Sequence, residues 1–198
     1  MITQLDRGIY LASRSPRRRE LLAQIGVKFE VIEVHLDEAV AAGESARGYV
    51  ERLARAKAEA GWQRMQESKL PEAPVLGVDT TVAVEGRILG KPADGREAAE
   101  MLAALSGRLH EVLTALALKF GSRLESAVSV SEVRFKTLTK EEIARYVATG
   151  ECEDKAGAYG IQGHAARFVA ELRGSFSGVV GLPLFETAQL LDRIGSAA

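Results

Sequence analysis

The sequence predicts an α/β fold, because short apolar runs typical of strands alternate with segments of helical periodicity. An apolar strand at residues 9–11 is followed at once by a helix over residues 16–25. A longer helix is predicted over residues 45–66, where apolar side chains recur at helical spacing. The longest apolar run, residues 75–84, is the length of a buried strand. These elements organise the rest of the chain.

The composition is that of an ordinary soluble protein and excludes several functional classes. Of 198 residues, 46% are hydrophobic and 27% are charged, with a net charge of −1. A protein that binds nucleic acid generally shows a basic face, so this balance argues against that class. Cys152 is the only cysteine, and the three histidines lack metal-ligand spacing. No segment is long and apolar enough for a membrane span, so we expect a cytoplasmic protein.

The first helix carries an unusual charge at its beginning. Ser15 is the expected N-cap and Pro16 the first helical residue, and Arg17, Arg18 and Arg19 fill the first turn. Cations at a helix N-terminus are unfavourable, because the helix dipole already places about half a positive charge there. An anion at this end would reverse the penalty, which predicts a phosphate cradle. The alternative is a solvated basic turn.

The next two elements offer a carboxylate pair and a lysine. We expect a second strand over residues 27–36 that leads into Asp37 and Glu38. Such a pair is also common in a plain polar loop. In the helix over residues 45–66, Lys57 lies four residues after Leu53 on the apolar stripe. Its ammonium either extends to the surface along the helix or points into a cleft.

Asp79 is the most anomalous residue in the chain. It interrupts the apolar strand over residues 75–84, which enters a hairpin at residues 85–86. A carboxylate inside a buried strand is costly unless it is paired, hydrogen-bonded or bound to a metal. Asp79 is therefore the leading candidate for a catalytic or metal-binding residue. The structural alternative is a simple ion pair with Lys91 on the returning strand.

The remaining elements follow from caps and periodicity. Asp94 and Glu97 predict a capping box, as do Thr139 and Glu142. A slip in the apolar phase between Val130 and Val133 predicts a β-bulge. The expected elements are a helix over 95–105, strands over 109–120 and 124–136, a helix from Thr139 to Gly150, a hairpin over 167–180 and a C-terminal helix that Pro183 opens.

A glycine-rich stretch over residues 154–163 lies between the helix expected to end at Gly150 and the hairpin expected over residues 167–180. Three glycines among ten residues indicate tight turns or close approach of the backbone to another group. Lys155 suits an anion, and the Gln162 amide suits the polar edge of a base. Without other evidence, the stretch is only a glycine-rich loop.

Sorted by chemistry, these side chains suit a metal-bound polyphosphate. Glu38 and Asp79 offer hard oxygen ligands, which favour Mg²⁺ or Mn²⁺ over zinc. The chain has neither the P-loop pattern nor the Gly-x-Gly-x-x-Gly dinucleotide turn. Groups that could bind the phosphates are Ser13, Arg17, Arg18, Lys57, Lys91 and Lys155.

Six motifs together resemble the Maf family of nucleotide pyrophosphatases (septum formation proteins), and in particular its dTTP/UTP pyrophosphatase branch. The resemblance extends from Leu11 to Leu191. The motifs are Leu11-Ala12-Ser13-x-Ser15-Pro16-Arg17-Arg18, Leu53-Ala54-Arg55-x-Lys57-Ala58, Gly77-x-Asp79-Thr80, Gly90-Lys91-Pro92, Asp154-Lys155-Ala156-Gly157-Ala158-Tyr159-Gly160-Ile161-Gln162-Gly163 and Gly178-x-Val180-Gly181-Leu182-Pro183.

The resemblance implies metal-dependent hydrolysis of a nucleoside triphosphate between its α and β phosphates. Asp79 would accept the proton, and Glu38 with Asp79 would hold the divalent cation. The family assigns phosphate binding to Ser13, Arg18, Lys57 and Lys91, and choice of base to Arg17, Thr80 and Gln162. It also implies one domain over residues 1–198, built on a long twisted mixed sheet flanked by helices, with two lobes around a central cleft, and a homodimer.

Two residues depart from the family pattern. Arg14 stands where glycine is frequent and Gly90 where near relatives often have glutamate. Three other functions stay open at this point. They are a non-enzymatic regulator of septum formation and cell division, a nucleic-acid-binding module that uses the arginines, and a pyrophosphatase of the same fold for other modified nucleotides. Base choice depends on a few contacts, so the sequence alone does not separate the last of these.

Overall fold

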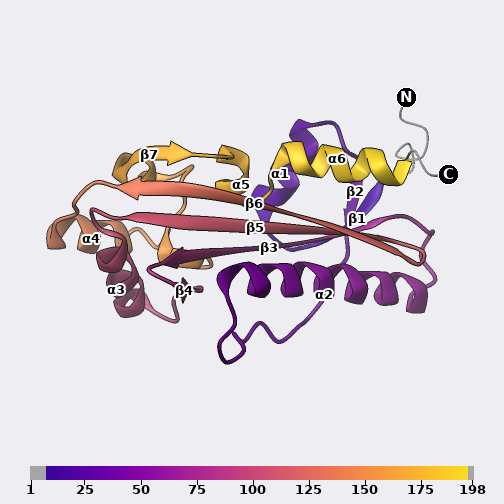
Figure 1. Cartoon of the computed structure of the whole chain (residues 1–198), viewed down its shortest axis with the longest axis horizontal. Coiled ribbons are helices and arrows are strands. Elements are labelled where there is room, and N and C mark those ends of the chain that lie inside the picture. Colours follow the sequence, from indigo (N-terminus) through magenta and orange to yellow (C-terminus); the bar gives the residue numbers. More distant parts are fainter. Residues whose placement is uncertain (1–7, 196–198) are drawn as a thin grey trace.

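The computed structural model describes residues 8–195 and contains one mixed β-sheet (Figure 1). Among these residues the sheet has seven strands in the order β2-β1-β3-β5-β6-β7, with β4 paired to β3. The strands are β1 (Ile9–Ala12), β2 (Phe29–Val31), β3 (Val75–Val84), β4 (Arg87–Leu89), β5 (Leu109–Phe120), β6 (Arg123–Phe135) and β7 (Val169–Arg173). Strand β1 runs parallel to β2 and β3, and the other pairs are antiparallel. The expected mixed sheet is confirmed.

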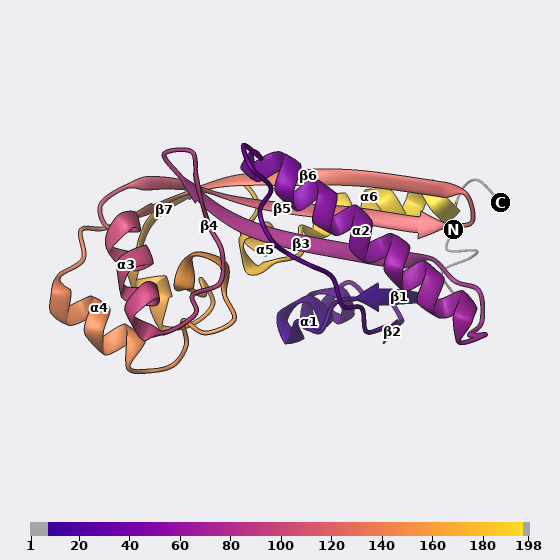
Figure 2. The ribbon, with the colours of Figure 1, turned by 90° about the horizontal axis from the view of Figure 1, so that it is seen from below.

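Helices cover both faces of this sheet. Helix α2 crosses one face, and α6 lies on the other (Figures 1 and 2). Helices α3 and α4 gather at the end of the molecule that is distant from both termini. The helices are α1 (Pro16–Gln24), α2 (Ala46–Glu67), α3 (Gly95–Leu105), α4 (Lys140–Val147), α5 (Phe176–Val180) and α6 (Leu184–Gly195). Within residues 8–195, no helix combines the length and the apolar character that crossing a membrane requires.

Local signals placed most helix ends correctly. The Ser45 and Asp94 side chains accept hydrogen bonds from main-chain N–H groups of the first turns of α2 and α3. The capping box at Thr139 is complete. In α3 the Glu97 carboxylate instead accepts from the N–H of Ala93, one residue before the cap. Ser15 is at the N-cap of α1, but its side chain makes no capping bond.

The expected strand over residues 27–36 is wrong beyond Val31. Strand β2 is at the sheet edge and pairs only with the four-residue β1, through Phe29–Val31. The N–H of Ile32 still donates to the carbonyl of Leu11 at 3.0 Å, but no strand of the described sheet pairs with the residues that follow, so the chain leaves the sheet there. Ile32 is still buried, in a cluster that includes Trp62 of α2, and the segment continues to Glu38.

The expected hairpin over residues 167–180 is also wrong. Only Val169–Arg173 forms a strand, β7, and it pairs with β6. The Ser175 hydroxyl accepts a hydrogen bond from the N–H of Gly178, which starts helix α5 instead of a returning strand. A short cap thus overrides the apolar alternation of this segment.

The β-bulge expected between Val130 and Val133 is absent from the described sheet. Pairing of β5 with β6 is continuous from Leu109–Arg134 to Phe120–Arg123. A register shift occurs only between Arg134 and Phe135, in the pairing with β7. The phase slip has another cause, because the inward positions of β6 include Ser129 and Ser131. Ser131 exchanges hydrogen bonds with the main chain of Ser175, so a polar contact replaces the apolar one.

Gly77 allows helix α2 to lie directly on strand β3. A Cβ atom at this position would be 2.5 Å from the main-chain nitrogen of Ala58 and closer still to the carbonyl oxygen of Ala54. Both neighbours are main-chain atoms of α2, which side-chain rotation cannot move away. The absence of a side chain at Gly77 therefore fixes the distance from β3 to α2, and with it the position of Lys57.

We expect Gly77→Ala to lower the free energy of unfolding by about 3 kcal/mol, because the added methyl group must displace the helix backbone. Chemical denaturation would measure this change. Gly90→Ala is the control, since no atom lies within 4 Å of its Cβ position. It should change stability by less than about 1 kcal/mol. Equal midpoints for the Gly77 variant and the wild type would contradict the close packing.

His110 is a buried histidine that should make stability depend on pH. It is 2% exposed, its Nε2 lies 2.9 Å from the Tyr159 hydroxyl, and its ring packs edge-on against Phe135. Burial lowers the pKa of His110 to about 4, and a main-chain interaction with Arg108 only partly opposes this. Between the ordinary value of about 6.5 and this pKa, the unfolded chain binds a proton that the native protein does not.

Stability should therefore fall as the pH falls through this window, and His110 should account for about 2 kcal/mol between pH 7 and pH 4.5. His110→Gln removes the titrating ring and should reduce the pH-dependent loss by that amount. Denaturant titrations of both proteins at the two pH values measure it. Parallel losses in the two proteins would rule out His110 as a source.

Candidate active site

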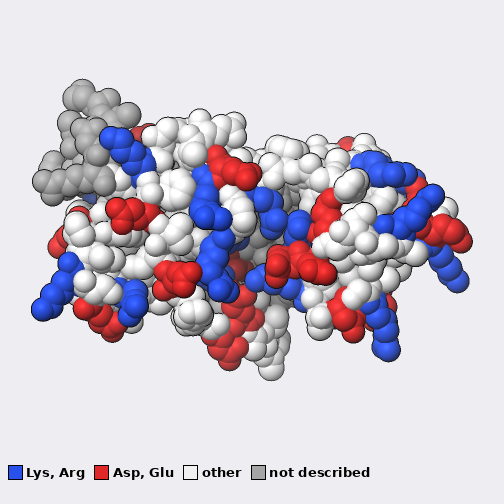
Figure 3. Space-filling model, turned by 180° about the vertical axis from the view of Figure 1, so that it is seen from behind, with Lys and Arg blue, Asp and Glu red and all other residues white. Residues whose placement is uncertain are grey.

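A cleft of about 820 Å³ lies between the turn after β1, the start of α2 and the glycine-rich loop. Figure 3 shows basic and acidic side chains interspersed across the middle of the molecule. The structure brings the arginine turn and Asp79 into one cleft, as the sequence predicts. Its lining includes Ser13, Arg17, Arg18, Glu38, Lys57, Asp79, Thr80, Lys91, Lys155 and Gln162.

Lys57 links the two carboxylates of the cleft. Its Nζ lies 2.7 Å from Asp79 Oδ1 and 2.7 Å from Glu38 Oε1. Lys57 comes from α2, Asp79 from β3, and Glu38 from the segment before α2. The ammonium thus points into the cleft and does not extend along the helix to solvent. Asp79 is 6% exposed, so this ion pair supplies the partner that its burial requires.

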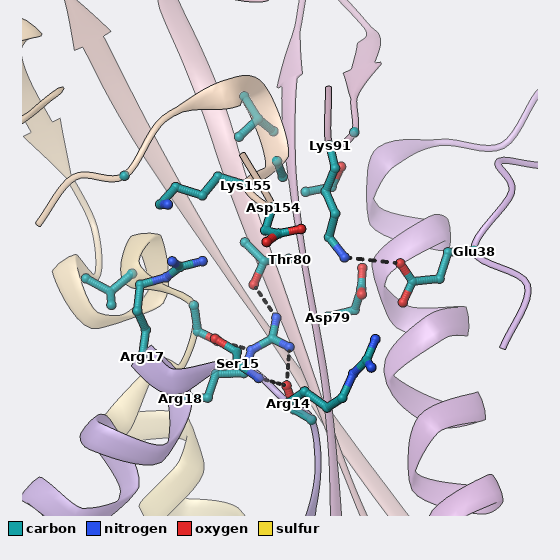
Figure 4. A pocket seen from close by; sticks show the side chains of 18 of the residues that line it. Arg14, Ser15, Arg17, Arg18, Glu38, Asp79, Thr80, Lys91, Asp154 and Lys155 are labelled. Atoms are coloured by element: carbon teal, nitrogen blue, oxygen red, sulfur yellow. Dashed lines mark hydrogen bonds and ion pairs between the residues drawn. The ribbon is translucent and has the colours of Figure 1, made fainter. Parts of the chain in front are cut away.

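The partner of Asp79 is Lys57 and not Lys91. Lys91 extends from the segment after β4, and its Nζ lies 3.7 Å from Glu38 Oε2 (Figure 4). Within the described residues Lys91 forms no ion pair with Asp79, so that alternative is wrong. Its side chain is 59% exposed, which leaves its charge accessible from the cleft.

The pKa values of the Asp79 and Glu38 carboxyl groups shift in opposite directions. Burial raises the pKa of Asp79, and the nearby charges of Lys57 and Arg18 only partly offset this. Burial also raises the pKa of Glu38, but the Lys57 hydrogen bond and the charges of Lys57, Lys91 and Arg18 lower it below its ordinary value. The difference follows from exposure, because Glu38 is far more accessible to water than Asp79. Asp79 is accordingly the stronger base of the pair.

Arg18 joins three segments at the base of the cleft. Its Nε donates to the carbonyl of Gly181 at 2.9 Å. Its Nη1 donates to Ser13 Oγ at 2.9 Å and to the carbonyl of Val78 at 3.1 Å, and its Nη2 donates to Thr80 Oγ1 at 3.0 Å (Figure 4). Four of the five guanidinium N–H groups therefore have partners inside the protein. In this geometry Arg18 mainly holds the arginine turn against β3, and one N–H remains for a ligand.

Other cations extend freely into the cleft. Figure 4 shows Arg17 and Arg14 on either side of Arg18. Neither guanidinium has a hydrogen bond or ion pair within residues 8–195. Arg17 belongs to the first turn of α1, where the N-cap side chain accepts no hydrogen bond from the main-chain N–H groups. Gln162 lines the same cleft from the glycine-rich loop and is exposed.

Lys155 does not present its ammonium to the cleft in the way that the sequence suggests. Its Nζ donates to the carbonyl of Glu151 at 2.6 Å and to that of Glu153 at 3.4 Å. Burial and the positive charge of Arg17 lower its pKa. Lys155 therefore lines the cleft, but its ammonium is bonded to carbonyl groups of the segment just before the glycine-rich loop.

The donor chemistry fits a hard divalent cation. Glu38 and Asp79 converge on one positive charge, the Lys57 ammonium, and both are oxygen ligands. The described residues contain no group of three or more His, Cys, Asp or Glu side chains that could hold a metal ion. Magnesium commonly uses one or two carboxylates and takes its other ligands from phosphate oxygens and water. The two carboxylates satisfy that requirement if substrate completes the set.

Three further residues support the site and were missed in the sequence. The Tyr49 hydroxyl donates to the main-chain carbonyl of Glu38 at 2.9 Å, which holds that segment on the cleft. The Glu151 carboxylate accepts from the Tyr146 hydroxyl and the N–H of His164, on either side of the glycine-rich loop. The Thr114 hydroxyl oxygen, on β5, lies 2.9 Å from the Thr80 hydroxyl oxygen. Only Thr114 left a signal, as a lone hydroxyl in an apolar run.

The comparisons with known proteins agree over the whole described chain. A family model described as "Maf-like protein" matches residues 8–194. A "dTTP/UTP pyrophosphatase" of Aromatoleum aromaticum is 59% identical over 196 residues, which cover 94% of this chain and 95% of that relative. Another protein of that description, from Chromobacterium violaceum, is 53% identical over 190 residues, 96% of each chain.

Among solved structures, the Staphylococcus aureus Ham1 protein aligns with a TM-score of 0.44 and 14% sequence identity. The alignment covers 64% of this chain and 71% of that one.

We expect Lys57→Met to raise the pKa of Asp79 further, because it removes the charge and the hydrogen bond that oppose the effect of burial. A carboxyl ¹³C titration of the metal-free protein by NMR measures the shift. The acid limb of any activity that requires ionised Asp79 would move to higher pH. Lys119→Met is the matched control, because Lys119 is equally exposed, at 12%, and its Nζ pairs at 3.0 Å with Glu59. An unchanged Asp79 pKa in the Lys57 variant would contradict the assignment.

Proposed function

This chain belongs to the Maf-like protein family, and we propose that it hydrolyses dTTP and UTP to the nucleoside monophosphate and pyrophosphate. The observation that carries the proposal is the convergence of Asp79, Lys57 and Glu38 in a cleft that the arginine turn also lines. Relatives with the name dTTP/UTP pyrophosphatase match it over nearly their full length.

Cations around the cleft would bind the triphosphate. Arg17 and Lys91 extend into it with charges that solvent can reach, and Lys57 lies deeper, between the carboxylates. Main-chain N–H groups at the start of α1 would add hydrogen bonds to phosphate oxygens. Ser13 and Arg18 bond to each other, so they would shape the turn and contribute at most the capacity that remains free.

Glu38 and Asp79 would hold a divalent cation, Mg²⁺ or Mn²⁺, together with phosphate oxygens. The chemistry that such an ion supplies is polarisation of a phosphoryl oxygen and stabilisation of developing negative charge. The carboxylates would then neutralise less of the Lys57 charge, because they also bind the cation. The Lys57 ammonium would be able to interact with the phosphates.

Asp79 would act as the general base. The oxygen of a water molecule bonds to the α-phosphorus while the bond from that phosphorus to the bridging α–β oxygen breaks. The proton of the water moves to Asp79, and pyrophosphate leaves with the bonding electrons. The raised pKa of Asp79 suits this task, since a carboxylate of higher pKa is a stronger base.

Arg17, Thr80 and Gln162 would select the base. Gln162 is exposed at the cleft on the glycine-rich loop, and its amide offers both a donor and an acceptor. Uracil and thymine present one N–H between two carbonyl groups on their pairing edge, a pattern that an amide can match.

Three further expectations accompany this proposal. The whole chain would act as one domain with two lobes around the cleft. The enzyme would be cytoplasmic, and it would form a homodimer, as the resemblance implies.

The direct test is a panel of nucleoside triphosphates with Mg²⁺ or Mn²⁺, with pyrophosphate and orthophosphate measured separately. We expect pyrophosphate from dTTP and UTP. Asp79→Asn should lower kcat about 10²–10⁴-fold, because the amide cannot accept the proton. Glu85→Gln, which removes an exposed carboxylate from the turn that follows β3, is the control and should leave kcat unchanged. Orthophosphate as the product, or full activity in the Asp79 variant, would refute the proposal.

A further inference from the structure

We propose that Thr114 is a positioning residue that fixes the direction of the Thr80 hydroxyl, so that Thr80 offers a ligand in the cleft only a hydrogen-bond acceptor. The inference rests on the proposed function and adds a reason for the choice of base. Thr80 and Thr114 are paired residues of neighbouring strands β3 and β5. Nothing in the motifs above involves Thr114.

The hydrogen-bond partners of these hydroxyls determine where each proton lies. Thr114 Oγ1 is 2.8 Å from the carbonyl oxygen of Gly178, and a carbonyl can only accept. Thr114 must therefore donate to Gly178. It then has only lone pairs for Thr80, whose Oγ1 lies 2.9 Å away, so the Thr80 proton points toward Thr114.

The Arg18 guanidinium fixes the other hydrogen bond of the Thr80 hydroxyl. Arg18 Nη2 donates to Thr80 Oγ1 at 3.0 Å, and Arg18 has no acceptor atom. The chain of donation runs from Arg18 to Thr80, then to Thr114, then to the carbonyl of Gly178. Thr80 has used its proton and one lone pair, and a single lone pair remains.

The reverse order is unfavourable because the site is closed to water. If Thr114 donated to Thr80, its oxygen and the carbonyl oxygen of Gly178 would face each other at 2.8 Å as two acceptors. Thr114 is 0% exposed, so no solvent molecule could relieve that contact. Thr80, by contrast, is partly exposed and lines the cleft.

This fixed direction suits one class of base. Uracil and thymine carry a proton on N3, which can donate to the remaining lone pair of Thr80. Cytosine has a bare lone pair on N3, which would meet another lone pair. A freely rotating threonine could serve either base, whereas a Thr80 held by Thr114 and Arg18 favours the bases with an N3–H group.

The test compares kcat/KM for UTP with kcat/KM for CTP in variants at position 114. Thr114→Val removes the acceptor that holds the Thr80 proton, so the proton can turn to cytosine N3. We expect the ratio of kcat/KM for UTP to that for CTP to fall about tenfold, because one hydrogen bond that distinguishes the two bases is no longer directed. Thr114→Ser keeps the hydroxyl and should keep the wild-type ratio.

Thr187→Val is the matched control. Thr187 is also 0% exposed, and its hydroxyl donates to the carbonyl of Pro183 at 2.7 Å in helix α6, outside the cleft. This variant loses a comparable buried hydrogen bond and should keep the wild-type ratio. Thermal melts by circular dichroism establish that each variant is folded.

Four results would overturn the inference. They are an unchanged ratio in folded Thr114→Val, the same change in Thr187→Val, a changed ratio in Thr114→Ser, and a shift in the preference for UTP over dUTP without one for UTP over CTP. The last would place the Thr80 lone pair on a ribose hydroxyl. If the wild type releases no pyrophosphate from UTP or dTTP, the proposed function fails and the inference fails with it. Activity on both with an unchanged ratio overturns the inference alone.

Discussion

The charge on Asp79 is the constraint on which the rest of the structure depends. A carboxylate inside a central strand persists in ionised form only if a cation reaches it, and Lys57 does so at 2.7 Å. That distance requires α2 to lie directly on β3, which the missing side chain of Gly77 permits. The same ammonium holds Glu38 at the cleft, and Tyr49 fixes the main chain of Glu38. Asp79, Glu38 and helix α2 are therefore held together by direct contacts through Lys57 and Tyr49.

Strand geometry places a second polar system beside the first. Consecutive residues of a strand point to opposite faces, so Asp79 turns toward α2 and Thr80 toward the arginine turn (Figure 4). On that second side, most N–H groups of Arg18 donate to protein acceptors. The Thr114 hydroxyl donates to the main-chain carbonyl of Gly178. Preorganisation of this kind avoids reordering of dipoles when substrate binds. Under the proposed function, the charge that binds phosphates would come from residues with free side chains, such as Arg17.

The glycine-rich loop contributes shape more than charge. A Cβ atom at Gly157 would lie 2.8 Å from Val82 of β3, and its φ of 67° also favours glycine. The loop therefore packs against the strand that carries Asp79. The Lys155 ammonium donates to the carbonyl groups of Glu151 and Glu153, just before the loop, and the Glu151 carboxylate accepts from residues on both sides of it. Only the Gln162 side chain remains exposed to the cleft among the polar groups that the sequence singled out there.

The sequence by itself determined the α/β class, most helix ends and the presence of a buried carboxylate at Asp79 that needs a partner, because caps and apolar periods are fixed by neighbours a few residues apart. Tertiary structure decided which cation Asp79 meets, since Lys57 and Lys91 both had suitable chemistry and only the packing of α2 separates them. It also ended the strand expected over residues 27–36, which had no partner strand other than β1. It directed the Lys155 ammonium to the carbonyl groups of Glu151 and Glu153. Pairings between distant residues depend on the assembled sheet and helices, and no local pattern encodes them.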